Sequence, residues 1–388
     1  MSFYDLVRDI ESRRGEVIDL ITGAPLSFDG IGRLLGAEMA APRWIDARRL
    51  GAYADYDGIG EFVEMLVGRW SAMLGRQLDP REVMVTPGAQ GALTLVLHWL
   101  ATAGRRPLYP LALEFPGAVA RAGRSVGRYR SVPYGADGHV RAVLPDPAEL
   151  DWSGVGAVLL SQPHNPTGVA FSPEELATLV AAAGRHDALV VIDRTYALPE
   201  APMAVRPPPV PVDTHVVQIL SFSKVGLASE RVGVLIGPAD LVTELRSIQR
   251  RLFLQTPKVG QALAAALLDG LDRDPELAAG VGEAYRTRWW TLRDALAAAA
   301  PEALAAGRLR AHEWQGGPFL WAELVGASDQ EVVRAALREG VAVLPGSELG
   351  LRSDGENPNA IRVGLGAPVD VLADAGQRLG KALRTIVG

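Results

Sequence analysis

The chain has 388 residues, enough for a large core and for two subdomains rather than one compact unit. Apolar residues make up 48% and charged residues 22%, and the formal net charge of −6 offers no broad basic surface to nucleic acid or an anionic membrane. Cysteine is absent, which excludes disulfides, thiolate nucleophiles and Cys-ligated metals.

The start of the chain, MSFYDLVRDIESRRGE, lacks the apolar core of a signal peptide, and no stretch approaches ~20 uninterrupted apolar residues. We therefore expect a cytoplasmic protein with no membrane partner. The histidines show no spacing that is typical of a metal site, so we expect no bound metal.

Short strand patterns alternate with longer helical patterns through the first two thirds of the chain. A strand pattern at 82–88 leads through a turn into an apolar helical pattern at 89–104. A second strand pattern at 156–163 precedes a helix at 172–186 that starts with Ser-Pro-Glu-Glu. Further Val/Ile/Leu runs follow at 188–194, 215–221 and 231–237. Because these runs are apolar throughout, they predict strands covered on both faces, in a three-layer α/β domain with a mostly parallel sheet.

The pattern changes in the last third of the chain. Residues 238–300 are almost entirely helical in pattern, whereas short strands and two helices alternate after Pro301. This alternation predicts a smaller α+β domain at the C-terminus. The Pro-rich segment 200–213 is expected to be a surface excursion, since proline cannot donate to a strand ladder.

Four short motifs fall at strand-to-loop junctions, where open α/β sheets place their ligands. TPGAQGAL (86–93) opens a helix, whose first backbone N–H groups form an anion site. SQPHNPTG (161–168) closes a buried strand and puts the Asn165 amide at the carboxyl edge of the sheet. VVIDRTYALP (190–199) ends a strand at Asp193, whose carboxylate needs a partner when it is buried.

The fourth motif, SFSKVGLASERVG (221–233), surrounds Lys224 with two serines and Arg231. Hydroxyls and a guanidinium suit a phosphate, and a lysine becomes an amine nucleophile when its pKa is lowered. A Schiff-base lysine, an aspartate for a pyridinium nitrogen and an anion site together describe pyridoxal 5'-phosphate (PLP).

With these motifs in this order, the chain resembles the fold-type I, class I/II aminotransferases over essentially its whole length. It looks closest to their valine–pyruvate branch. The motifs that carry the resemblance are Y-x-x-x-x-G (Tyr53 to Gly58), PGAQ-A-L, NPTG, D-x-x-Y, S-x-S-K and R-V-G. The resemblance implies a three-layer aspartate-aminotransferase-like fold. Its expected parts are an N-terminal arm packing with the small domain (1–40), a large PLP-binding domain (41–270) and a small C-terminal domain (271–388).

The same resemblance implies roles for residues around the PLP ring. Lys224 would form the aldimine and move the substrate proton, and Asp193 would pair with the pyridine nitrogen. Asn165 and Tyr196 would bond the phenolic oxygen, and Phe115 would stack on the ring.

Phosphate and substrate contacts are implied in the same way. The phosphate would be held by the Gly88 turn with the backbone of Ala89 and Gln90, by Ser221 and Ser223, and by Arg231. Tyr53 would reach the phosphate in a neighbouring subunit, so the active sites would be shared in a homodimer. Arg362 would bind the substrate α-carboxylate, and Gly23 and Asn165 would line the substrate pocket.

The function that this resemblance implies is transamination from an amino acid to a 2-oxo acid by a ping-pong mechanism. An alternative is a PLP enzyme of specialised metabolism that eliminates, replaces, cyclises or oxidises. A non-catalytic sensor with a DNA-binding domain ranks last, because no helix-turn-helix pattern fits the sequence. His164 is either an acid–base group or a loop residue. Arg250 and Arg251 either bind a substrate side-chain acid across a dimer or form a solvated pair.

Overall fold

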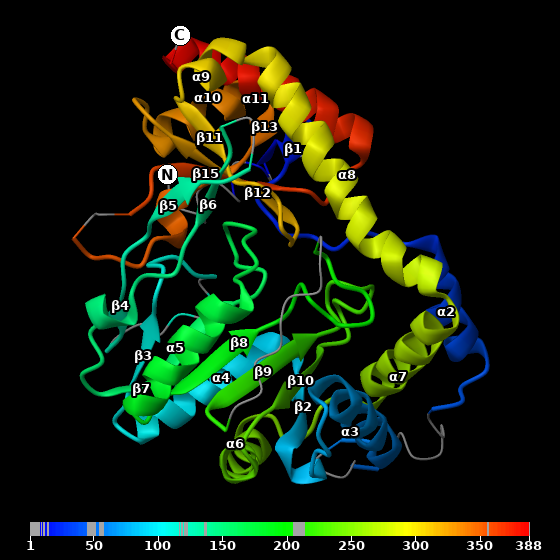
Figure 1. The fold of residues 1–388 in the computed structure, drawn as a ribbon. Coiled ribbons are helices and arrows are strands. Elements are labelled where there is room, and N and C mark those ends of the chain that lie inside the picture. Colours follow the sequence, from blue (N-terminus) through cyan, green and yellow to red (C-terminus); the bar gives the residue numbers. More distant parts are fainter. Residues whose placement is uncertain are drawn as a thin grey trace.

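The chain folds into two lobes, a larger one built on a seven-stranded sheet and a smaller one built on a four-stranded sheet (Figure 1). The computed structural model describes residues 8, 10, 12–13, 15–44, 52–53, 58–115, 117, 119, 123–135, 138–204, 214–354 and 357–387. Residues 205–213, most of the expected Pro-rich excursion, lie outside this described part. Within it, no helix is long and apolar enough to cross a membrane.

The sheet of the large lobe is mostly parallel, as predicted. Only β10 runs antiparallel, to both of its neighbours, and the other pairings are parallel. Its strands, in spatial order, are β2 (Val83–Pro87), β10 (Val232–Ile236), β9 (Val216–Ser221), β8 (Leu189–Asp193), β7 (Val155–Ser161), β3 (Arg106–Tyr109) and β4 (Ser125–Val126).

Helices cover both faces of this sheet, which gives the three layers. Leu235 of β10 packs with α4 (Gly88–Thr102) and α6 (Ala239–Leu252), whereas Val234 packs with α3 (Gly60–Leu74) and α7 (Lys258–Arg273). Because successive strand residues point to opposite faces, these helices form separate layers. On the second face, α5 (Pro173–Arg185) covers β7 and β8. Its start is the predicted capping box, in which Ser172 and Glu175 bond each other's backbone N–H.

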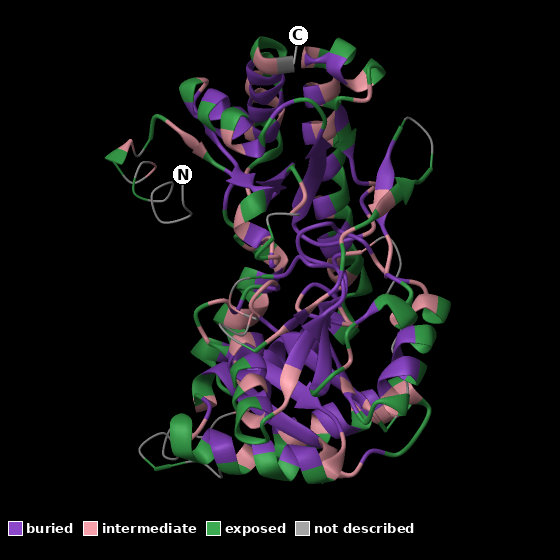
Figure 2. Ribbon diagram, turned by 90° about the vertical axis from the view of Figure 1, so that its left-hand side faces the viewer, coloured by how far each residue is buried: buried purple, intermediate pink, exposed green. Residues whose placement is uncertain are grey.

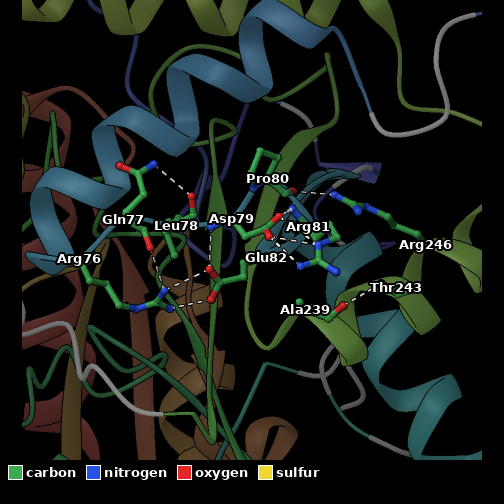
Figure 3. A network of polar contacts seen from close by, with 10 residues as sticks. All are labelled: Arg76, Gln77, Leu78, Asp79, Pro80, Arg81, Glu82, Ala239, Thr243 and Arg246. Atoms are coloured by element: carbon green, nitrogen blue, oxygen red, sulfur yellow. Dashed lines mark hydrogen bonds and ion pairs between the residues drawn. The ribbon is translucent and has the colours of Figure 1, made fainter.

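A polar network fixes the chain just before β2 (Figure 3). Arg76 holds the Glu82 carboxylate through N–H···O contacts of 2.7 and 3.1 Å, and Glu82 also accepts from the Asp79 backbone N–H at 2.8 Å. Arg246 of α6 donates to the Pro80 carbonyl at 3.0 Å. The network therefore anchors the strand whose other end carries the turn into α4.

The small lobe follows the helices α6 and α7. Its antiparallel sheet has the order β11 (Leu309–Ala311), β12 (Phe319–Leu324), β15 (Ala360–Gly364) and β14 (Leu344–Pro345). Around it lie α8 (Pro275–Ala299), α9 (Pro301–Ala305), α10 (Asp329–Arg338) and α11 (Val369–Val387). Buried residues fill the interior of both lobes (Figure 2).

Two segments join the lobes: the N-terminal segment and a hairpin of the large lobe. Strand β1 (Ile18–Asp19) pairs in parallel with β13 (Val341–Ala342) of the small lobe, whereas α2 (Asp29–Ala40) packs on α7 of the large lobe. The hairpin of β5 (Ser131–Pro133) and β6 (Val140–Ala142) also reaches the small lobe, where Val140 forms a bridge with His312. The domain boundaries at residues 40 and 270 stay a prediction.

Candidate active site

A cavity of about 370 Å³ lies at the carboxyl ends of β7, β8 and β9, where residues from both lobes meet. It gathers nearly all the predicted site residues: Gly23, Ala89, Gln90, Phe115, Asn165, Asp193, Tyr196, Ser221, Ser223, Lys224, Arg231 and Arg362. Five further residues line it that sequence reasoning missed: Leu93, Glu114, Ser161, Thr195 and Phe319.

Lys224 is the amine of this cavity, placed in the loop after β9. Its Nζ donates a hydrogen bond to the Gly23 carbonyl. Burial, followed by the positive charges of Arg362 and Arg231, lowers its pKa to about 8, against the opposing charge of Asp193. A much larger fraction of this amine is therefore neutral near pH 7 than of an ordinary lysine, as a nucleophile requires.

Asp193 ends β8 with one carboxylate oxygen bonded and one available. Oδ1 accepts from the Thr195 backbone N–H at 2.9 Å and from its hydroxyl at 2.6 Å. No donor among the described residues contacts Oδ2. Burial raises the pKa of Asp193, while the Thr195 bonds and the charge of Lys224 oppose this shift. The side chain can therefore accept a further hydrogen bond from a cationic N–H in the cavity.

An anion cradle, formed by Ala89, Gln90, Ser221, Ser223 and Arg231, occupies one end of the cavity. No side chain caps the N-terminus of α4, so its first N–H groups are open to a ligand. Arg231 donates to the Ser223 hydroxyl at 3.1 Å.

Two glycines make the close packing behind this cradle possible. Gly88 has φ +73°, and a Cβ there would lie 2.6 Å from Arg231 Nη2. A Cβ on Gly233 of β10 would lie 2.5 Å from the Gly88 carbonyl carbon. Strand β10, the N-terminus of α4 and the Arg231 guanidinium are thus packed so closely that only glycine fits at these two positions.

Arg362 is the cation at the other end of the cavity and comes from β15. It donates from Nη1 to Asn165 Oδ1 at 2.9 Å and from Nη2 to the Ile21 carbonyl at 2.8 Å. Its guanidinium carbon lies 4.0 Å from the Phe319 ring centroid. Asn165 Nδ2 in turn donates to the Tyr196 hydroxyl at 3.3 Å.

This guanidinium has no acidic partner among the described residues, and its buried Nε has no hydrogen-bond acceptor. Burial lowers the pKa of Arg362 to about 10, so it remains cationic at neutral pH. Because an unpaired buried cation is costly, a carboxylate ligand is the complement that this end of the cavity lacks.

The structure separates several predicted residues from the cavity wall. Gly88 supports Arg231 from behind, and Tyr53 lies outside with 76% of its surface exposed. Arg250 and Arg251 stand at the exposed C-terminal end of α6.

His164 is buried, and both of its ring nitrogens have partners. Nε2 donates to the Leu113 carbonyl at 3.3 Å, and Nδ1 accepts from the Thr167 hydroxyl at 2.9 Å. Burial lowers the pKa of His164 to about 3, so the ring stays neutral. These contacts favour the loop interpretation of this residue over an acid–base one.

Two of the missed residues had a local signal in the sequence. Thr195 stands two residues after Asp193, the spacing at which an aspartate side chain bonds the following backbone. Glu114 directly precedes Phe115. Phe319 had no such signal, because its contact with Arg362 depends on the register in which β12 pairs with β15.

Comparison with known proteins gives one family and consistent relatives. The family model described as aminotransferase class I and II matches residues 15–378. Over 236 residues the chain is 27% identical to the valine–pyruvate aminotransferase of Escherichia coli K12; this covers 56% of the chain and only 55% of that relative's length. Over 345 residues it is 28% identical to the arginine–pyruvate transaminase of Pseudomonas aeruginosa, covering 87% of the chain and 83% of the relative.

The fold has a close counterpart among solved structures. The crystal structure of valine–pyruvate aminotransferase from Salmonella typhimurium superposes with a TM-score of 0.86 at 20% identity. The match covers 100% of this chain and 99% of that one. The two chains therefore share one architecture.

Proposed function

The chain belongs to the aminotransferase class I and II family and is an aminotransferase of that family, and we propose that it uses PLP held at Lys224. The family membership confirms the resemblance drawn from the sequence motifs. One observation supports the proposal of PLP at Lys224: a single cavity holds a lysine of lowered pKa, an aspartate with an available oxygen, an anion cradle and an unpaired buried guanidinium.

The residues of the cavity fit the parts of PLP. The anion cradle suits its phosphate, Asp193 Oδ2 suits its pyridinium nitrogen, and Phe115, with 43% of its surface exposed, can stack on its ring. Asn165 and Tyr196 line the same cavity and would bond its phenolic oxygen. When bound, PLP supplies an aldehyde that captures amino groups and a ring that withdraws electrons from the substrate α-carbon.

The protein's own residues then orient the substrate and move its proton. Arg362 grips the α-carboxylate with its planar fork, which fixes the direction of the α-C–H bond. The Lys224 amine would take the proton from the substrate's α-carbon and return it to the cofactor carbon on the other side of the transferred nitrogen. The Gly23 carbonyl, which contacts Nζ, steadies the amine between these positions.

We propose an amino acid as donor and a 2-oxo acid as acceptor, in ping-pong order. The names of the two relatives pair valine or arginine with pyruvate, and this supports small-molecule substrates of that kind. A biosynthetic role is a further proposal. The cytoplasmic location stays a prediction, as does a role for Arg250 and Arg251 in binding a side-chain acid.

We also propose a homodimer with shared active sites. Tyr53 is 76% exposed, as expected of a side chain that would enter the active site of a partner subunit. Lys258 bonds the Ala52 carbonyl and keeps this segment beside α7. Near the same corner, Leu252, Phe253, Leu254 and Val259 expose apolar surface.

The test is a half-reaction with single amino acids. The purified protein should absorb visible light through its bound cofactor, and one amino acid without any oxo acid should convert the cofactor to its amine form and release one 2-oxo acid. Release of ammonia, loss of a side-chain substituent or consumption of oxygen would instead establish the alternative chemistry. Lys224→Ala should abolish both absorbance and turnover; if both persist, the assignment of the site is wrong.

A further inference from the structure

Glu114 is a buried carboxyl of the cavity to which the proposed chemistry gives no role. It stands in the loop after β3, is 4% exposed and lines the cavity beside Phe115. No lysine, arginine or histidine of the described residues forms an ion pair with it. A buried carboxyl without a cation is costly when ionised, so its protonation state needs an explanation.

The contacts of Glu114 tie it to both sides of the site. Its Oε1 accepts from the Phe115 backbone N–H at 2.8 Å and from the Ser161 hydroxyl at 3.4 Å. Ser161 in turn accepts from the Asn165 backbone N–H at 2.9 Å. Ser161 also stands opposite Asp193 in the pairing of β7 with β8. Glu114 is therefore a neighbour of Asp193 at the same strand ends.

Two carboxyls in one cavity favour a state in which one of them keeps its proton. Asp193 has the stronger support for a charge, because Thr195 donates to it twice and Lys224 is nearby. Glu114 has one short donor and one long one. Burial first, and then the charge of Asp193, raise the pKa of Glu114 to about 8.

We propose that Glu114 is a positioning residue that holds the proton of this carboxyl pair and so keeps Asp193 ionised toward the bound cofactor. The inference rests on the proposed function, since it assigns Asp193 to the pyridinium nitrogen. Two other titratable groups interact with the pair: the charges of Asp193 and Glu114 act on Tyr196 after β8, and Lys224 after β9 acts on Asp193. Arg362 of β15 lines the same cavity.

The proposal predicts that Glu114 adds its own step to the titration of the site, beside that of the Lys224 amine, whose pKa is also about 8. Below about pH 8 the residue is neutral, and above it a second negative charge stands beside Asp193. The absorbance of the bound cofactor in the wild-type holoenzyme should therefore show a transition near this pH. Glu114→Gln keeps the acceptor for Phe115 and Ser161 but cannot ionise, so it should lose that transition and keep the wild-type spectrum below it.

Infrared difference spectroscopy of the wild-type holoenzyme detects the same proton directly, without relying on the absorbance of the cofactor. The carbonyl stretch of a protonated carboxylic acid should disappear as the pH rises through about 8, and Glu114→Gln should lack this change. Glu200→Gln is the matched control, because Glu200 also has a raised pKa but pairs with Arg69 outside the cavity. Its absorbance titration should equal that of the wild type.

The proposal is overturned if Glu114→Gln titrates like the wild type, or if its spectrum already differs below pH 8, because glutamine mimics the protonated acid. Absence of the infrared change in the wild type overturns it as well. Failure of the proposed function looks different: the wild type would then show no cofactor absorbance at all, with either glutamate in place.

Discussion

At the scale of single residues, the site contains two cations, Lys224 and Arg362, that form no ion pair with an acidic side chain of the described residues. Among the described residues, Lys224 bonds only the Gly23 carbonyl, and Arg362 bonds an amide and a carbonyl instead of an acid. Each is thereby kept available for a ligand, and each lowers the stability of the folded chain when no ligand is bound.

Lys224→Met should stabilise the cofactor-free protein. The folded-state pKa is about 8 against 10.5 for an ordinary lysine, so between these values the unfolded chain binds more protons and stability rises with pH. Below this window the burial of the charge costs about 3 kcal/mol. Urea unfolding should show Lys224→Met more stable at pH 7, with the gain vanishing above pH 10.5. Equal stability at pH 7 would contradict the lowered pKa.

Arg362→Gln should raise the KM for the amino acid far more than it affects binding of the cofactor. Two charge-assisted hydrogen bonds to the α-carboxylate contribute roughly 3–5 kcal/mol, so kcat/KM should fall by about 10²- to 10³-fold. Steady-state kinetics measure the loss, and Arg384→Gln on the exposed side of α11 is the control. A KM unchanged from wild type would remove Arg362 from the substrate site.

At the scale of elements, helix α4 connects the far edge of the sheet to the anion cradle. Its two ends offer a matched pair of glycines, Gly88 and Gly104, with φ of +73° and +65°. An alanine at either position carries the same left-handed strain, but only at Gly88 does it collide with Arg231.

Gly88→Ala should therefore lower the affinity for PLP by at least about tenfold, beyond the strain of about 1–2 kcal/mol that both variants share. Gly104→Ala should lose stability alone, because nothing lies within 4 Å of its added Cβ. Cofactor titration and thermal unfolding separate the two effects. Equal cofactor affinities for both variants would show that Arg231 does not depend on this contact.

The hairpin of β5 and β6 leads to a second prediction at this scale. Just before it, the Tyr129 hydroxyl donates to Glu323 at 2.6 Å and accepts from Trp321 Nε1 at 3.2 Å, joining the large lobe to β12. Tyr129→Phe leaves Trp321 Nε1 without its acceptor and removes one donor from Glu323, which keeps its contact with His312. It should cost about 1–3 kcal/mol. Thermal unfolding should show the loss, while Tyr134→Phe, on the exposed part of the hairpin, should not.

The elements that could be read from the sequence were those with a strong local pattern. The capping box of α5, the long apolar strands β7 to β10 and the turn into α4 all carry one. The hairpin of β5 and β6 carries none, since its strands have three residues each; they pair with each other, and Val140 forms a bridge with His312 of the small lobe.

The site was predictable to the same degree. Most site residues inside the strand-end motifs were found, although Leu93, Ser161 and Thr195 of the same motifs were missed. Phe319 depends on strand register, and Glu114 on a loop that the small lobe fixes through the Leu349 carbonyl.

At the scale of the whole molecule, the exposed apolar corner between α6 and α7 is the surface that suits the proposed homodimer contact. Replacing Leu252 and Leu254 together by Glu should convert a dimer to a monomer, because two charges would be buried in the contact. Sedimentation measures the change, and the monomer should also retain less PLP if Tyr53 serves the partner's site. Val325→Glu, an exposed position of the small lobe, is the control. A wild-type monomer that transaminates would refute the shared site.

The hydrogen bonds from Lys224 to Gly23 and from Arg362 to Ile21 span 201 and 341 residues of sequence. A ribosome releases the N-terminal segment first, long before either cation has been made. That segment can form these hydrogen bonds only after Lys224 and Arg362 have been synthesised, and strand β13, with which it pairs, is also synthesised late. A chain released before residue 362 would carry the amine and the anion cradle but not the guanidinium that we propose for the α-carboxylate. Translation thus completes the residues of the proposed PLP site in the large lobe before the residue proposed to recognise the amino acid.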